Sequence, residues 1–193
     1  MRFITLFINL FSGFIFSLLS FAATAEVTGS REYKYYEISP RTAYEIKPEL
    51  MRRSPIREGG GTFNGHTDWY VDWRYQSSQP ASGCQVHDIR TTVRVIHTLP
   101  VLSQYVTDQQ TIDVFTRFSD ALTKHEINHG NNGISAAREM DKAFNEVPAQ
   151  QSCRNLARII DSICNTTIQK YIQADNDYDH MTRNGETEGA VIY

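Results

Sequence analysis

Residues 108–144 place apolar side chains at the spacing of one helix face, and this long periodic segment restricts the possible folds most. Its apolar positions are Ile112, Val114, Phe115, Phe118, Ala121, Leu122 and Ile127. Residues 152–174 follow the same period, with Leu156, Ile159, Ile160, Ile163, Ile168 and Ile172 as the apolar stripe. The second half of the chain is therefore predicted to form two long helices.

The first half has the two-residue period of β-strands. Residues 32–38 are rich in tyrosine, and residues 69–75 place Trp, Val, Trp and Tyr at alternate positions. A turn at residues 77–83 separates this segment from a further strand over residues 84–99, which predicts an antiparallel hairpin. Strands followed by helices indicate one α+β domain, in which an antiparallel sheet packs on two long helices.

The first predicted helix contains the sequence His125-Glu126-Ile127-Asn128-His129. Residues four apart share a helix face, so His125 and His129 can bind one metal ion. Glu126 adjoins the first ligand and cannot easily reach the same ion. It can instead take a proton from a water that the metal activates and pass it to a leaving group. The pattern predicts one Zn²⁺, with Glu126 as general base, in a zincin-like domain.

A third ligand must come from outside this motif, and two regions can supply it. If the helix breaks at residues 130–133 (Gly-Asn-Asn-Gly), an acidic residue beyond the break can turn back: Glu139, Asp141 or Glu146. The polar residues 175–180 can reach the site if the second helix returns antiparallel to the first. Asp179 is the predicted third ligand, and His180 is the alternative in the same segment.

The N-terminal segment resembles an export signal. Arg2 precedes a mostly apolar run, and Ala23-Thr24-Ala25 has the small residues that signal peptidase recognises. This predicts a signal peptide over residues 1–25 and a mature domain over residues 26–193, secreted or periplasmic. An uncleaved membrane anchor is the competing interpretation.

Charge and composition limit the classes of molecule that the mature domain is expected to bind. With Arg2 removed, its net charge is 18 − 22 = −4. A mildly acidic domain without a basic run lacks the patches that bind nucleic acid or hold a protein on an anionic membrane. The predicted partner is a peptide or protein substrate, with no nucleic acid and no stable membrane association after cleavage.

Three cysteines follow the signal: Cys84, Cys153 and Cys164. Cys153 and Cys164 fall in one predicted helix, roughly 16 Å apart along its axis, which is too far for a disulfide. Cys84 therefore pairs with one of them or remains unpaired. Cys153 is favoured because it lies at the helix start, beside a loop, and Cys164 is then a buried thiol.

The order of these features resembles a bacterial domain-of-unknown-function family, number nine-two-two, over roughly residues 32–193. The likeness rests on Trp69-x-Val71-x-Trp73-x-Tyr75, Gly83-Cys84, Leu99-Pro100, the HExxH helix, Cys153, and a closing run from Tyr178 to Ala190. The resemblance implies a secreted zinc-dependent protease with the same metal pair and base, and it supports the Cys84–Cys153 pairing. The family has a histidine where this chain has Asn184, which leaves His180 or Asp179 to act in its place.

The predicted function is therefore metal-assisted hydrolysis of a peptide bond outside the cytoplasm. Two alternatives remain: a binding protein of the cell envelope with a structural zinc, and a zinc amidase acting on cell-wall peptides. Tyr178 is a candidate donor to a developing oxyanion. Trp69 is expected in the core of the sheet, and His97 is expected to be an ordinary strand residue.

Overall fold

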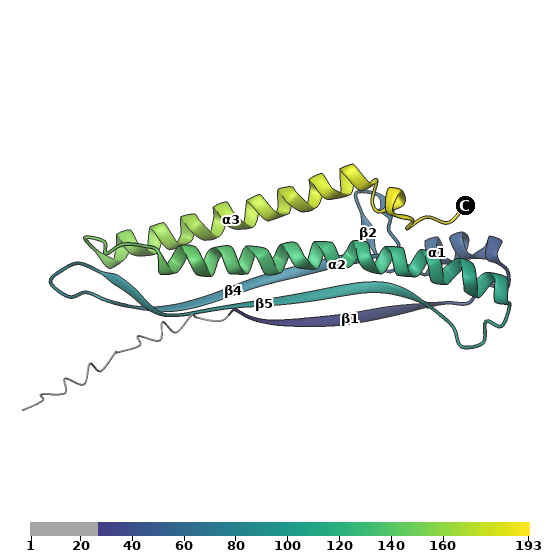
Figure 1. Ribbon diagram of the computed structural model, residues 1–193, viewed down its shortest axis with the longest axis horizontal. Coiled ribbons are helices and arrows are strands. Elements are labelled where there is room, and N and C mark those ends of the chain that lie inside the picture. The colour runs from purple at the N-terminus through teal and green to yellow at the C-terminus, as the bar shows by residue number, and fades with distance from the viewer. Residues whose placement is uncertain (1–26) are drawn as a thin grey trace, which may run out of the picture.

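The computed structural model describes residues 27–193, so the predicted signal peptide, residues 1–25, lies outside the described residues. None of the helices that the structure describes is both long enough and apolar enough to cross a membrane. The described chain forms one α+β domain in which two long helices lie on a three-stranded sheet (Figure 1).

The sheet contains β1 (Thr28–Ile38), β4 (His66–Ser78) and β5 (Gln85–Leu102), in the order β1-β5-β4. The antiparallel pairing of β4 with β5 agrees with the predicted hairpin. The prediction of an entirely antiparallel sheet is wrong, because β1 pairs with β5 in parallel, from Thr28 opposite Thr92 to Ile38 opposite Leu102. β4 lies between β1 and β5 in the chain and runs opposite to both, so the chain reverses twice and β1 and β5 run in the same direction.

The connection between β1 and β4 consists of a short 3-10 helix η1 (Ala43–Glu45), α1 (Ile46–Arg53) and a small hairpin of β2 (Arg57–Glu58) and β3 (Gly61–Thr62). Gly59 and Gly60 form the hairpin turn, with φ angles of 56° and 83° that favour glycine. The segment that follows the hairpin leads directly into β4 and borders the candidate site.

The helix α2 (Gln109–Asn145) continues without a break through Gly130 and Gly133, so of the two possibilities left open, a straight or a broken helix, the straight helix is correct. A Cβ atom on Gly130 would lie 2.8 Å from Val95 Cγ1, and one on Gly133 would lie 2.5 Å from the Trp69 side chain. The glycines are needed because α2 packs very closely on β4 and β5. Tertiary packing thus outweighs the weak helix propensity of glycine.

The second long helix α3 (Cys153–Thr182) runs antiparallel to α2 (Figure 1) and extends beyond the predicted end at residue 174. Residues 175–180, expected in a polar tail, belong to its last turns. The helix ends where Arg183 and Asn184 adopt left-handed conformations, each with φ of 54°. A 3-10 turn, η2 (Glu186–Glu188), follows.

The core divides into clusters along α2. One cluster gathers Ile38, Ile46, Leu50, Leu99, Phe115, Phe118 and Leu122 near its start. Another gathers Ile89, Met140, Phe144, Leu156 and Ile160 near its end. The two histidines of the motif lie between these clusters in sequence, so packing on both sides fixes the part of α2 that carries them.

A disulfide joins Cys84 to Cys153, as predicted, and Cys164 is a buried free thiol. Two backbone hydrogen bonds between Cys84 and Gln150 lie beside it, from Cys84 N to Gln150 O (2.7 Å) and from Gln150 N to Cys84 O (2.8 Å). These contacts tie the start of β5 to the α2–α3 connection.

Candidate metal centre

The structure brings His125, His129 and Asp179 together at one point between α2 and α3. The Nε2 atoms of the two histidines lie 3.2 Å apart. Asp179 Oδ1 lies 3.0 Å from His125 Nε2 and 3.1 Å from His129 Nε2. Both histidines are buried, and the side chain of Asp179 is 38 % exposed. The three residues could hold a metal ion.

Among the residues that the structure describes, the group that could hold a metal ion contains Asp179 and none of the other predicted candidates for the third ligand. His180 and Asn184 are exposed. Glu139 binds Lys170 and Tyr171, because α2 continues straight and carries it away from the motif. Asp141 accepts a hydrogen bond from Thr91, and Glu146 lies near Lys142.

Each histidine uses its other ring nitrogen to bind a carboxylate. His125 Nδ1 lies 2.9 Å from Glu188 Oε2, and His129 Nδ1 lies 2.9 Å from Asp175 Oδ1. An ionised carboxylate only accepts, so each Nδ1 donates its proton. In the neutral rings both Nε2 atoms then present lone pairs to the same point, which is the orientation of metal-binding histidines.

The supporting carboxylates are themselves fixed. Asp175 accepts from Asn132 Nδ2 and from the indole N–H of Trp69, each at 2.7 Å. Trp69, expected only as a core residue, therefore links β4 to the candidate ligand His129 through Asp175.

Tyr178 supports the other histidine. Its ring stacks on His125 at a centroid distance of 4.8 Å, and its hydroxyl donates to Glu188 at 2.8 Å. Asn128 donates to the same hydroxyl at 2.7 Å. Glu188 was not identified from the sequence, because a single acidic residue after a helix carries no distinguishing signal.

The electrostatics of the centre favour a positive charge. Burial lowers the pKa of His129, but the hydrogen bonds to Asp175 and Asp179 outweigh it and raise this pKa to about 10. Burial raises the pKa of Asp179, yet hydrogen bonds from both histidines bring it well below its usual range. A metal cation can supply the same charge by replacing the protons on Nε2.

Glu126 follows the candidate ligand His125 in α2 and is buried, with 4 % of its surface exposed. Burial raises the pKa of Glu126 and outweighs the opposing hydrogen bond from Thr67. Thr67 Oγ1 lies 2.7 Å from Glu126 Oε2. Within residues 27–193, no hydrogen bond involves Oε1, and Glu126 lines a cleft of about 1000 Å³ together with His125, His129 and Asp179.

The cleft lies between β4 and α3. Consecutive residues 65–67 and 69–72 line one side, and Ile168 and Ile172 of α3 line it as well. A sheet face would contribute only every second residue of a strand, so the edge of β4 borders the cleft.

Comparison with known proteins identifies one similarity. The family described as "Bacterial protein of unknown function (DUF922)" matches residues 33–186, which confirms the resemblance drawn from the motifs. No curated protein and no solved structure matches the chain.

Proposed function

Because the chain belongs to the DUF922 family, whose function is unknown, we propose a function from its metal centre: this protein is a zinc-dependent peptidase acting outside the cytoplasm. The observation that carries the proposal is the convergence of His125 Nε2, His129 Nε2 and Asp179 Oδ1 beside Glu126. Two histidines and one carboxylate form a ligand set typical of catalytic zinc sites.

The donor atoms fit a zinc ion. Atoms bound tetrahedrally to one zinc at about 2.0–2.1 Å lie roughly 3.3 Å from one another. The three donors here are 3.0, 3.1 and 3.2 Å apart, close to one face of that tetrahedron. When bound, zinc supplies a Lewis acid that polarises a carbonyl and activates water near neutral pH.

Glu126 is assigned the proton transfer. Its Oε1 atom is the one left without a hydrogen bond among the described residues, on a side chain that lines the cleft. A carboxylate in this position takes a proton from the attacking water and returns it to the leaving amine. Burial raises the pKa of Glu126, which makes its carboxylate a stronger base toward the attacking water.

An extended peptide is the substrate that the cleft supports best. β4 is one of the two outer strands of the sheet and pairs with β5 in the order β1-β5-β4. An outer strand has unpaired N–H and C=O groups, which can bind a peptide as an additional strand. The arrangement of outer strand, cleft and HExxH helix underlies our assignment of a zincin-like fold.

The alternative of a structural zinc is less well supported. Structural zinc sites are usually closed by four protein ligands. Across residues 27–193, the metal-binding group contains three residues, which leaves a coordination position for substrate or water. The Cys84–Cys153 disulfide supports a location outside the cytoplasm, where disulfides persist.

Zinc analysis of the purified protein tests the proposal. We expect about one zinc ion per chain, and hydrolysis of dye-labelled casein that a chelator stops and added zinc restores. Cell-wall peptides assayed in parallel separate a peptidase from an amidase. Zinc bound without hydrolysis of either substrate would favour the binding-protein alternative.

Replacing Asp175 with Asn is expected to weaken zinc binding by about 10- to 100-fold, because His129 loses the carboxylate that orients its ring. Competition with a chromogenic chelator measures this change. Asp177→Asn is the matched control, since this exposed residue of the same helix accepts a hydrogen bond from Gln173 and is not part of the metal-binding group. Equal zinc affinity in both variants would contradict the role of Asp175.

A further inference from the structure

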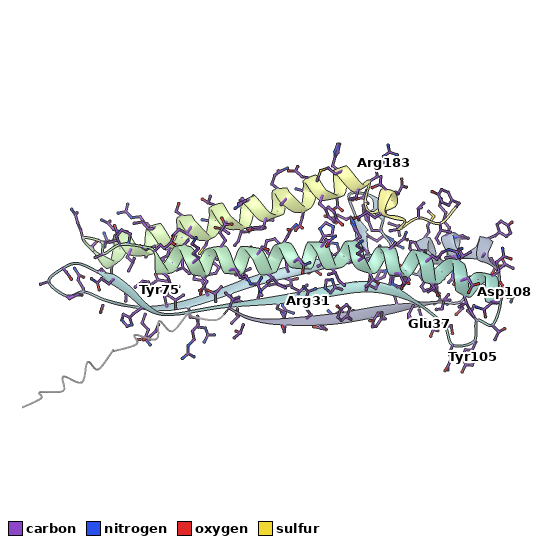
Figure 2. The ribbon with its side chains drawn as sticks, in the orientation of Figure 1. Arg31, Glu37, Tyr75, Tyr105, Asp108 and Arg183 are labelled. Carbon is purple, nitrogen blue, oxygen red and sulfur yellow. A yellow bond between two sulfur atoms is a disulfide. The ribbon has the colours of Figure 1, made fainter. Side chains whose placement is uncertain are left out.

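A chain of hydrogen bonds leads from the outer strand β1 to the carboxylate of Glu126. Arg31 on β1 (Figure 2) lies with its NH1 atom 3.4 Å from His97 Nε2, and its NH2 group donates to Asn131 on α2 at 2.6 Å. His97 Nδ1 lies 2.8 Å from Thr67 Oγ1. Thr67 Oγ1 lies 2.7 Å from Glu126 Oε2, so the chain crosses all three strands before it reaches α2.

The direction of these bonds follows from counting protons. Thr67 Oγ1 has three neighbours: His97 Nδ1, Glu126 Oε2 and the Glu126 carbonyl at 3.0 Å. A hydroxyl has one proton to donate, and both Glu126 oxygens are acceptors. His97 Nδ1 must therefore be the donor. Nε2 of the neutral ring is then an acceptor, in agreement with the guanidinium beside it.

The environment of His97 keeps the ring neutral. The residue is fully buried in β5, and burial and Arg31 lower its pKa to about 4. His97 is then neutral and carries its one proton on Nδ1. Arg31 donates to His97 Nε2, His97 Nδ1 donates to Thr67 Oγ1, and Thr67 donates to Glu126 Oε2.

We propose that Arg31, His97 and Thr67 form a positioning relay for the general base. The relay holds Oε2 of Glu126 and leaves Oε1 as the oxygen that exchanges protons in the cleft. This assignment rests on the proposed peptidase function. The three residues act through Glu126 and are positioning residues, without contact to the metal-binding atoms.

Gly65 completes this arrangement on the other side of the carboxylate. A Cβ atom at this position would lie 2.6 Å from Glu126 Oε1 and 2.9 Å from Leu122 Cδ1. The carboxylate therefore has Oε2 at the Thr67 hydroxyl and Oε1 beside Gly65, a residue that also lines the cleft.

Thr67→Val and Thr67→Ser test the relay in the zinc-loaded protein. Valine keeps the shape of threonine without the hydroxyl, and serine keeps the hydroxyl. We expect Thr67→Val to lower kcat by about 10- to 100-fold, the effect of losing one hydrogen bond to a charged group, with KM and zinc affinity unchanged. Thr67→Ser should retain near-wild-type kcat. Equal losses in both variants, or no loss in Thr67→Val, would overturn the proposal.

A second measurement does not depend on activity. ¹⁵N NMR of the histidine rings in the metal-free protein, with His97→Gln to assign the signals, should show His97 protonated on Nδ1. Exchange of that proton with solvent should become faster in Thr67→Val. Protonation on Nε2 would overturn the relay even if the protein hydrolyses peptides. Absence of hydrolysis in the wild type would overturn the peptidase function and, with it, the role of the relay.

Discussion

Glu126→Gln is expected to retain about one zinc ion per chain and to hydrolyse casein about 10³-fold more slowly than the wild type, the usual range for loss of a general base. Glutamine has nearly the size of glutamate and can still accept a hydrogen bond from Thr67 through its amide oxygen. The metal-binding atoms belong to other residues, so zinc content should not change. Zinc analysis and kcat/KM, measured on the same preparation, check this.

Glu139→Gln is the control for this variant. It changes the same residue type on the same helix, but Glu139 binds Lys170 at a distance from the metal centre. We expect its activity to equal that of the wild type. Full activity in Glu126→Gln would show that this carboxylate does not transfer the proton, and loss of zinc would show that it supports the metal.

Removal of the Cys84–Cys153 disulfide is expected to lower the free energy of unfolding by about 4 kcal/mol. The bond joins residues 69 positions apart. In the chain-entropy model, a crosslink of this span lowers the conformational entropy of the unfolded chain, which corresponds to about 4 kcal/mol of stability. The double variant Cys84→Ala/Cys153→Ala uses alanine because a serine at the buried position 84 would place a hydroxyl there without a hydrogen-bond partner. Urea unfolding of the double variant and the wild type measures the difference.

Cys164→Ala is the matched control, because this cysteine is buried and forms no disulfide. Its loss should cost only about 1 kcal/mol, the effect of a small cavity. If the double variant were destabilised no more than this control, the disulfide would not restrict the unfolded chain as expected.

The features predicted correctly from the sequence are those set by local geometry. His125 and His129 share a face of α2 because helix geometry alone places residues four apart on one side. The alternation over residues 69–75 predicted a strand for the same reason, and β4 contains it. Helix length excluded a bond between Cys153 and Cys164, and the position of Cys153 at a helix start favoured the Cys84–Cys153 pairing that the structure shows.

Other features depended on contacts between segments far apart in the chain. From the sequence, Gly130 and Gly133 left open whether the helix breaks. α2 continues through both, and its close approach to the sheet leaves no space there for larger side chains. The polar residues at the end of α3 have no apolar periodicity, so the prediction ended the helix too early. The parallel pairing of β1 likewise depends on β5, and not β4, being its neighbour in the sheet.

The sequence by itself determined the histidine pair, the adjacent Glu126 and the crosslink that fits a domain exported from the cytoplasm. Only the tertiary structure decided which carboxylates join them. Glu188 is 63 residues from His125, and Asp175 is 46 residues from His129. The relay to Glu126 begins in a strand almost 100 residues away. Local backbone geometry fixes which residues share a helix face, whereas packing between elements fixes which side chains meet across the cleft.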